Sequence, residues 1–584
     1  MPTSRVIHVV GAHPESGSLA LEGRPLVGGS GAGPLLVGDV GLSFWGGVDP
    51  QSGLVIDTHH PLAGQCVTGR VLAIPQGRGS CTGSAVLLEL ILAGRAPAAI
   101  IVSEPEEILT LGALVAQQLF GLDMPVLQVS AADFQRLGDY SHAALKAGRL
   151  VLADRPLGID DGADGDRPPA PPALRLDAID RDLLEGRHGA AAAAAMRLVL
   201  AMAALQGADS LIDVAQVHVD GCIYIGPASL RFAELLVSLG ARVRVPTTLN
   251  AISVDRRGWR AQGIDAELGV PASALADAYV AMGARPTFTC APYLLESAPA
   301  FGDQIGWAES NAVVYANSVI GARTMKYPDF LDICIALTGR APRAGCHVDA
   351  GRRAVLAIDM GLPDGADDAF WPLAGYCCGL LAAGDIPLIR GLEASRPSRD
   401  DLKAFGAAFA TVAAAPMFHI AGVTPEADGQ APGRSVTLAV EDLRRGWDEL
   451  NSSEDAEIGL VSLGNPHFSL AECERLAGLV EGRRRAPDVP VVVTCGRAVH
   501  EAAEKAGHVA RAEAFGVAFV TDTCWCMLGE PVIPVTAKAL MTNSGKYAHY
   551  APGLVGRSVR FGSLAACIEA ACSGKAALAR PDWL

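Results

Sequence analysis

A glycine-rich turn brings a serine to the start of a predicted helix. Gly77 and Gly79 precede Ser80, and apolar residues follow at helical spacing between Val86 and Ile91. Glycines let a backbone approach an anion, and a helix N-terminus offers amide donors and the positive end of a dipole. An alkoxide held there is stabilised, so Ser80 is a candidate base. The alternative is an ordinary helix-capping serine. A phosphate-binding P-loop is not indicated, because no Gly-Lys-Ser/Thr follows.

Fourteen cysteines form the second group of residues that could carry chemistry. Several stand where a predicted strand runs into a loop, which is where ligands bind in open α/β sheets. Thiolates there suit an iron–sulfur cluster, whose iron can act as a Lewis acid. No Cys-x-x-Cys pair occurs, so zinc-ribbon and ferredoxin patterns are absent, and buried core thiols remain the alternative for most of the fourteen. The cysteines concerned are Cys290, Cys346, Cys377, Cys378, Cys495, Cys524 and Cys526.

Four polar clusters interrupt otherwise apolar sequence. Buried charge is costly without a partner, so such groups are either paired within the fold or face a ligand. Their number, next to a metal-capable cysteine set, favours an active site over a purely structural role. A serine hydrolase is not indicated, because no Gly-x-Ser-x-Gly elbow occurs. The clusters are His218–Gly221, Trp307–Asn311, Gly464–His467 and Asn543–Tyr550.

These residues are carried by an alternating pattern of short strands and amphipathic helices, which predicts an α/β protein. A stretch rich in Pro, Asp and Gly divides the pattern. We therefore predict a small domain at 1–155, a linker at 156–174 and a large unit of several lobes at 175–584. In the small domain we expect a helix over Glu106–Phe120. In the large unit we expect strands at Ala241–Val245, Val491–Thr494, Ala518–Asp522 and Pro531–Thr536.

Composition narrows the class of protein further. The 584 residues carry a net charge of −16 and a mean hydropathy of +0.28, which rules out a disordered chain. An acidic chain without a basic run predicts no nucleic-acid partner and no binding to anionic membranes. The start of the chain lacks a signal-peptide core, and Ala190–Leu205 is too short and too weakly apolar to span a bilayer. The many cysteines then predict a reducing, cytoplasmic location.

Together these segments resemble the aconitase X family over nearly the whole chain. The small domain is similar to the family's swivelling subunit, and the large unit is similar to its large subunit. Because the small domain and the large unit stand in one chain, the arrangement resembles the fused bacterial type of the family. The segments that carry the resemblance are Ser43–Pro50, His60–Leu62, Gly77–Ser84, Gln216–Gly221, Thr289–Tyr293, Trp307–Ser310, Ala316–Thr324, Gly464–His467, Asp522–Cys524 and Lys546–His549.

The resemblance implies a small swivelling α/β domain fused to a large multi-lobe α/β domain, and a hydro-lyase acting at an iron-containing site. Fused members of the family dehydrate cis-3-hydroxy-L-proline to Δ1-pyrroline-2-carboxylate, and split archaeal members dehydrate mevalonate 5-phosphate. The expected partner is thus a small hydroxyproline-like amino acid, and the expected cofactor is an iron–sulfur cluster (a two-iron cluster among the options) or iron. Cys81 and Thr82 replace the Ser-Arg of true aconitases, which argues against tricarboxylic substrates. A phosphorylated hydroxy acid and a non-catalytic iron-binding regulator remain as alternatives.

The resemblance also implies roles for individual residues. Gly77–Ser80 resembles the Gly-x-Gly-Ser motif of true aconitases, in which the serine is the base that removes the α-proton, so Ser80 is the expected base. Cys290 and Cys524 are the expected cluster ligands, with Cys346 as the third and Cys378 and Cys495 as its rivals. The expected substrate-binding or proton-relay groups are His218, Glu309, Ser310 and Lys326.

Overall fold

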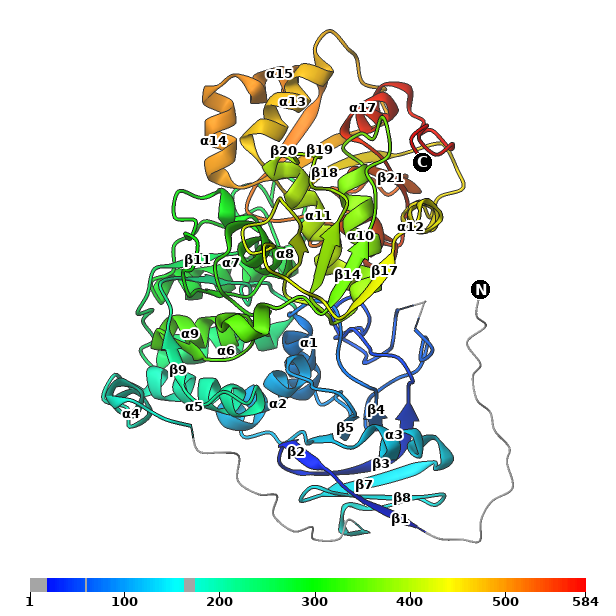
Figure 1. Cartoon of the computed structure of the whole chain (residues 1–584). Coiled ribbons are helices and arrows are strands. Elements are labelled where there is room, and N and C mark those ends of the chain that lie inside the picture. The colour runs from blue at the N-terminus through cyan, green and yellow to red at the C-terminus, as the bar shows by residue number, and fades with distance from the viewer. Residues whose placement is uncertain (1–17, 58–59, 162–173) are drawn as a thin grey trace. The chain divides into compact units, whose positions relative to one another are not determined.

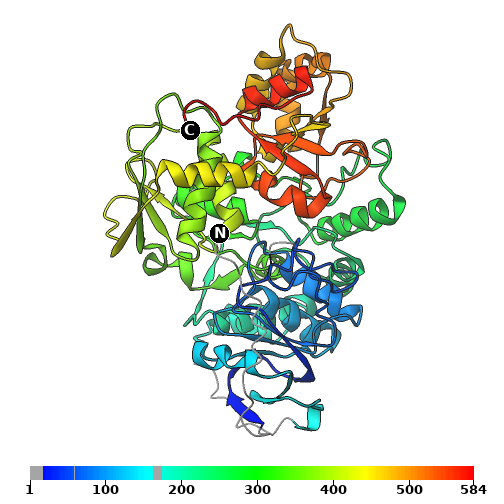
Figure 2. The same ribbon diagram turned by 90° about the vertical axis from the view of Figure 1, so that its right-hand side faces the viewer.

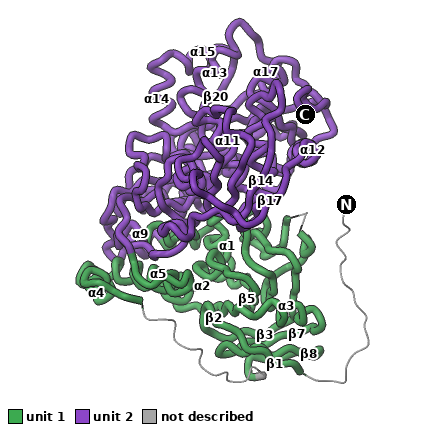
Figure 3. Tube along the Cα trace, viewed as in Figure 1, with its two compact units in different colours: residues 1–211, 225–232, 328–334 green, residues 212–224, 233–327, 335–584 purple. Residues whose placement is uncertain are grey.

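The structure is a computed structural model that describes residues 18–57, 60–161 and 174–584. Part of the predicted linker, residues 162–173, lies outside the described residues. Residues 1–17, where the sequence predicts no signal peptide, also lie outside them. The chain forms two compact units (Figure 3): residues 1–211, 225–232 and 328–334 make the first, and residues 212–224, 233–327 and 335–584 make the second. The first unit thus includes residues 175–211, directly after the predicted linker, and two short segments further along the chain.

The first unit is built on one eight-stranded mixed sheet in the order β1-β8-β7-β3-β4-β5-β6-β2 (Figure 1). Strands β3 to β6 are parallel and the other neighbours are antiparallel. The central strands β4 and β5 are wholly buried, so they are continuous apolar runs. The strands are β1 (Leu19–Glu22), β2 (Arg24–Val27), β3 (Ser30–Val37), β4 (Val71–Ala73), β5 (Ala99–Val102), β6 (Val126–Gln128), β7 (His142–Lys146) and β8 (Arg149–Ala153). The helices are α1 (Gly83–Leu92), α2 (Ile108–Phe120), α3 (Ala131–Gln135), α4 (Ala178–Leu184) and α5 (Ala190–Leu205).

The second unit contains three parallel sheets and a short strand pair. Their orders are β11-β10-β12, β16-β15-β14-β17 and β20-β19-β18-β21-β22, with β13 beside β9. The strands are β9 (Leu211–Asp213), β10 (Val217–Val219), β11 (Thr247–Leu249), β12 (Gly306–Trp307), β13 (Arg340–Pro342), β14 (Leu356–Asp359), β15 (Pro387–Arg390), β16 (His419–Ile420), β17 (Arg434–Thr437), β18 (Leu460–Phe468), β19 (Val491–Cys495), β20 (Val517–Val520), β21 (Ala539–Thr542) and β22 (Ser558–Phe561). The helices are α7 (Ala266–Ala281), α8 (Ser310–Tyr315), α10 (Phe370–Ala382), α11 (Arg399–Val412), α12 (Val440–Leu450), α13 (Leu470–Val480), α14 (Arg497–Lys505), α15 (His508–Phe515), α16 (Gly545–Val555) and α17 (Leu564–Ser573), while α6 (Pro227–Ser238) and α9 (Leu331–Thr338) contain residues of both units.

Helices cover both faces of the five-stranded sheet, whose strands run from orange to red in Figures 1 and 2. Val491 and Val493 pack into a core shared with α13, α15 and α17, whereas Val492 packs into the core shared with α10, α11 and α16. The second core also contains Ile358 and Ile389, so α10 and α11 join the four-stranded and five-stranded sheets. Within the described ranges, no helix has both the length and the apolar content that crossing a bilayer requires.

The predicted alternation of strands and helices is confirmed, but two of the predicted strands are wrong. Residues 241–245 form an irregular segment that bends at Arg244 and Val245, and the N–H groups of Val243 and Arg244 bond to loop and helix carbonyls instead of a neighbouring strand. The strand of this region is β11, which begins at Thr247. Residues 531–536 form turns, since Pro531 and Pro534 lack the N–H that a ladder needs, and the buried strand β21 follows.

The predicted helix over 106–120 begins two residues late. The Glu106 carboxylate accepts hydrogen bonds from the backbone N–H groups of Leu109 and Thr110 at 2.9 and 2.8 Å, which caps the helix.

Candidate functional site

In the first unit, Ser80 lies two residues before the N-cap of α1. Its Oγ accepts a hydrogen bond from the backbone N–H of Thr82 at 3.3 Å and donates to the Thr82 hydroxyl at 3.2 Å. Gly79 has a φ of +83°, and a Cβ there would lie 2.6 Å from Ser43 Oγ, so the turn requires glycine. Ser80 is half-buried, and the amides and dipole of α1 favour negative charge at its oxygen.

The start of α1 is anchored to two distant segments of the same unit. Ser84 Oγ donates to the backbone carbonyl of Asp329 at 3.1 Å, and the Asp329 N–H donates to the Cys81 carbonyl at 3.2 Å. Further along α1, the Glu89 carboxylate accepts from the Ala228 N–H at 2.7 Å. These bonds fix the serine-bearing turn against segments 225–232 and 328–334.

In the second unit, three thiols come together. Cys290 and Cys524 pack with Ala251 in one small buried cluster, and Cys526 packs against it. The neighbouring Cys524 thiol lowers the pKa of Cys526 to about 7, whereas burial raises the pKa of Cys290 to about 12. The group therefore holds one thiol that ionises near neutral pH beside two that stay protonated.

The end of β18 supplies hydrogen-bond donors to two of these sulfurs. The backbone N–H of His467 points at Cys290 Sγ at 3.3 Å, and Asn465 Nδ2 points at Cys526 Sγ at 3.3 Å. The His467 ring is buried, with Nε2 2.8 Å from the Thr523 carbonyl. Burial lowers the pKa of His467 to about 4, so the ring is neutral, and Nε2 must carry its proton because a carbonyl only accepts.

A buried carboxylate–ammonium pair lies beside the thiols. Lys546 Nζ is 2.8 Å from Glu309 Oε1, and Glu309 also accepts from the Ala312 N–H and from Asn311. Burial opposes both charges, but Lys546, together with the hydrogen bonds from Ala312 and Asn311, keeps the pKa of Glu309 below its usual value. Glu309 and the thiols likewise hold the pKa of Lys546 well above its usual value. Both groups are thus charged at neutral pH. Ser310 begins α8 directly after Glu309.

His218 lies on β10 with its ring fully buried. Its Nδ1 is 2.8 Å from Thr248 Oγ1, while its Nε2 has no hydrogen-bond partner among the described residues. Burial lowers the pKa of His218 to about 4, and Glu309 opposes that shift only in part. The ring is therefore neutral and has one nitrogen left over for a further polar group.

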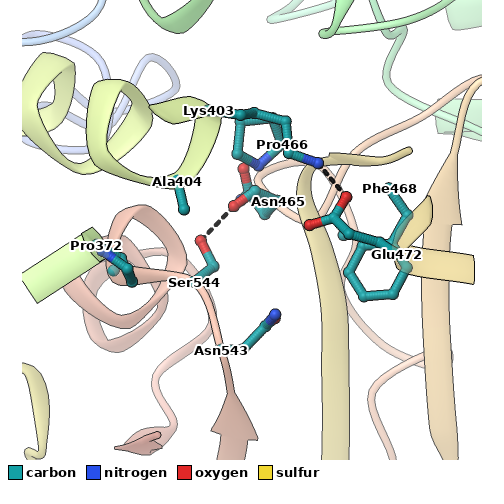
Figure 4. A pocket seen from close by; sticks show the side chains of 11 residues that line it. Pro372, Lys403, Ala404, Asn465, Pro466, Phe468, Glu472, Asn543 and Ser544 are labelled. Atoms are coloured by element: carbon teal, nitrogen blue, oxygen red, sulfur yellow. Dashed lines mark hydrogen bonds and ion pairs between the residues drawn. The ribbon is translucent and has the colours of Figure 1, made fainter. Parts of the chain in front are cut away.

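A small pocket of about 20 Å³, partly open to solvent, adjoins the end of β18 (Figure 4). Asn465 lines it and also bonds Cys526, so the pocket and the thiols share one side chain. Lys403 and Glu472 form an ion pair on its wall, and Lys403 Nζ also donates to the His467 carbonyl at 3.1 Å. Ser544 Oγ donates to the Asn465 carbonyl. These contacts hold the end of β18 in place.

Other residues predicted for the site lie in different surroundings. Lys326 Nζ donates to the Ala413 carbonyl at 3.0 Å, at the C-terminal end of α11. Cys346 Sγ donates to the Gly351 carbonyl at 3.5 Å, and Cys346 packs near Arg352 rather than in the Cys290 cluster. Its rivals Cys378 and Cys495 are buried in the two large apolar cores.

The structure adds residues that the sequence reasoning did not select. Cys526 joins Cys290 and Cys524, and its signal was present, because it stands two residues from Cys524 in the same loop. Asn465 and Lys546 were marked only as members of polar clusters. Within the described ranges, no three His, Cys, Asp or Glu side chains form a ready site for a single metal ion. Thiols with N–H donors aimed at them are the residue types that could hold an iron–sulfur cluster, and Cys290, Cys524 and Cys526 are the candidates here.

Comparison with family models places four domains along the chain. Residues 20–153 match the aconitase X swivel domain, 173–350 the first domain, 352–448 the second domain and 458–573 the third domain. The first unit's sheet thus coincides with the swivel match, and the three sheets of the second unit fall into the other three matches in order.

Curated relatives and a solved structure agree with these matches. Cis-3-hydroxy-L-proline dehydratase of Pseudomonas aeruginosa is 58% identical, covering 96% of this chain and 98% of its own, and that of Hypocrea jecorina is 53% identical, covering 95% of both. The phosphomevalonate dehydratase large subunit of Methanothermobacter thermautotrophicus is 34% identical, covering 65% of this chain and 94% of its own. The crystal structure of Thermococcus kodakaraensis aconitase X (holo-form) is 30% identical, with a TM-score of 0.62 over 68% of this chain and all of that one.

Proposed function

Since the chain belongs to the aconitase X family, we propose that it is a hydro-lyase that dehydrates cis-3-hydroxy-L-proline to Δ1-pyrroline-2-carboxylate. The observation that carries this proposal is the near full-length match to relatives of that name, both fused chains like this one. Dehydration of mevalonate 5-phosphate is the second candidate. It is supported only by relatives that match about two thirds of this chain at lower identity.

Ser80 is the proposed base. In its alkoxide form Oγ would take the proton from the α-carbon, and the C–H electrons would form the double bond to the β-carbon as the hydroxyl departs. A proton delivered to that hydroxyl completes the loss of water, and the resulting enamine tautomerises to the cyclic imine. The Thr82 N–H at 3.3 Å and the dipole of α1 support the role, because both stabilise negative charge on Oγ.

Cys290, Cys524 and Cys526 are the proposed ligands of an iron–sulfur cluster or iron. When bound, such a group supplies Lewis acidity that helps a hydroxyl leave. The chain itself would position the sulfur ligands. The His467 N–H and the Asn465 amide orient two sulfurs, and the thiol of Cys526 ionises near neutral pH.

Glu309, His218 and Ser310 are the proposed substrate-contacting or proton-relay groups. Lys546 keeps Glu309 ionised, so this carboxylate can attract the substrate's ring ammonium. His218 Nε2, buried and without a partner among the described residues, can hold or pass a proton. Lys326 is proposed as a helix-capping group instead, because its ammonium binds the end of α11.

Anaerobic turnover of iron-reconstituted protein tests this function. The imine product is trapped with o-aminobenzaldehyde, and trans-3-hydroxy-L-proline and mevalonate 5-phosphate are run in parallel. We expect turnover of the cis isomer alone and its loss in Ser80→Ala, with Ser130→Ala, which removes an exposed cap of α3, as the matched control. Turnover of mevalonate 5-phosphate alone would favour the second candidate. An active Ser80→Ala variant would remove Ser80 from the mechanism.

A further inference from the structure

The two loops that carry the three thiols both begin at a residue with left-handed backbone. Phe288, two residues before Cys290, has a φ of +42°, and Asp522, two residues before Cys524, has a φ of +69°. Both side chains are fully buried. Non-glycine residues rarely adopt this conformation, and a bulky one such as phenylalanine does so only when its surroundings hold it there.

One side chain contacts both of these residues. The Arg497 guanidinium binds the Asp522 carboxylate through two parallel hydrogen bonds of 2.5 and 2.6 Å. Its Cζ also lies 5.0 Å from the centroid of the Phe288 ring, within cation–π range. A planar guanidinium can form a two-pronged bond in its plane and stack over a ring with its face, which an ammonium cannot.

The backbone around Arg497 is packed closely onto the same loops. Gly496, the N-cap of α14, is packed tightly against Thr289, because a Cβ there would lie 3.1 Å from Thr289 Oγ1 and 3.2 Å from its Cβ. Thr289 is the neighbour of Cys290. On the other loop, the Asp522 carbonyl accepts from the Ile252 N–H at 2.7 Å. The start of α14 therefore lies against one loop through Gly496 and binds the other through Arg497.

We infer that Arg497 is a positioning residue for the three-thiol centre. Its guanidinium ties the loop of Cys524 and Cys526 to the loop of Cys290, so it sets the distance between the sulfurs that the two loops contribute. The inference rests on the proposed iron-binding role of these thiols, but the bond to Asp522 and the stack on Phe288 are independent of any bound group. Residues that orient metal ligands change metal affinity without touching the metal.

The first test compares iron binding in full-length Arg497→Met, Arg497→Lys and Phe288→Leu. Arg390→Met is the matched control, because Arg390 makes a two-pronged bond with Asp359 at 2.6 and 2.7 Å on the four-stranded sheet. After anaerobic reconstitution we expect Arg497→Met to bind iron about 10- to 100-fold more weakly against a competing chelator. We also expect altered thiolate-to-iron absorption bands. Arg497→Lys and Phe288→Leu, which each keep one of the two contacts, should fall between it and wild type, and Arg390→Met should match wild type.

The second test needs no iron. In apo protein, the bifunctional alkylating reagent dibromobimane should attach first to Cys526. Its second arm, then held beside Cys290 at high effective concentration, should close a Cys290–Cys526 bridge that peptide mass spectrometry identifies. We expect a lower yield of this bridge in Arg497→Met and in Arg497→Lys than in Arg390→Met. If wild type binds no iron but this yield still depends on Arg497, the proposed cofactor fails and the positioning role stands.

The inference would be overturned if Arg497→Met keeps its iron against the chelator, absorbs light and forms the thiol bridge as the wild type does. If circular dichroism shows that Arg497→Met does not fold, the same measurements are made on Arg497→Lys and Phe288→Leu. The positioning role would be refuted if both variants match the wild type in iron binding and in bridge yield.

Discussion

The buried pair of Lys546 and Glu309 allows a stability prediction worked from its geometry. The two charges are 2.8 Å apart, with side-chain exposures of 15% and 8%. At an effective dielectric constant of about 20, their attraction is about 6 kcal/mol, part of which is offset by the cost of burying both charges. Lys546→Met removes the attraction and leaves the Glu309 carboxylate buried with only its bonds to Ala312 and Asn311. We expect the free energy of unfolding to fall by about 3–5 kcal/mol.

The pH dependence of this loss follows from the pKa of Glu309. In the wild type that pKa lies below its unfolded value, so the pair stabilises the fold above the unfolded pKa and the effect fades as pH falls through the lowered one. In Lys546→Met, burial is no longer opposed by an ammonium and the pKa should rise above the unfolded value. The variant is then favoured at acidic pH and loses stability as pH rises. The gap between the two proteins should therefore narrow from pH 7 to pH 5.

Urea unfolding followed by tryptophan fluorescence measures this effect. Six of the seven tryptophans belong to the second unit, so the signal reports the unit that contains the pair. The double variant Lys546→Met with Glu309→Gln is the control, because a neutral amide leaves no buried charge behind. It should regain most of the lost stability at pH 7. A Lys546→Met variant within about 1 kcal/mol of wild type at both pH values would refute the buried ion pair as a major contribution.

Three further predictions concern single side chains. In apo protein, iodoacetamide should alkylate Cys526 with a midpoint near pH 7 and leave Cys290 unreacted until far more alkaline pH, as read by peptide mass spectrometry; equal rates would contradict the pKa difference. Cys526→Ser should lose iron on reconstitution while Cys346→Ser retains it, by metal analysis, and the opposite result would restore Cys346 as the third ligand. Lys326→Met should lower the free energy of unfolding by about 1–2 kcal/mol, because the substitution leaves carbonyls at the end of α11 unpaired, and it should leave KM unchanged. A raised KM with unchanged stability would instead make Lys326 a substrate-binding residue.

The sequence carried much of the candidate chemistry because that chemistry depends on local order. Glycine at 79 is needed for a turn with φ of +83°, and this need is visible in the chain whatever its surroundings. Ser80 then follows from its place before a helix. Position at strand ends left several cysteines open as ligands, and it was the resemblance to the family's motifs that favoured Cys290 and Cys524. The two misplaced strands show the limit, since residues 241–245 and 531–536 have suitable composition but lack ladder partners.

The sequence by itself therefore determined the fold class and the residue types available for a dehydratase. Only tertiary structure decided which cysteines meet. Cys526 joins Cys290 across more than two hundred residues, while Cys346 packs near Arg352. It also decided that Lys546 pairs with Glu309 and that Lys326 binds the end of α11. The physical reason is that thiol contacts and ion pairs depend on distances of a few ångströms, and these are set by how separate strands and helices pack rather than by spacing along the chain.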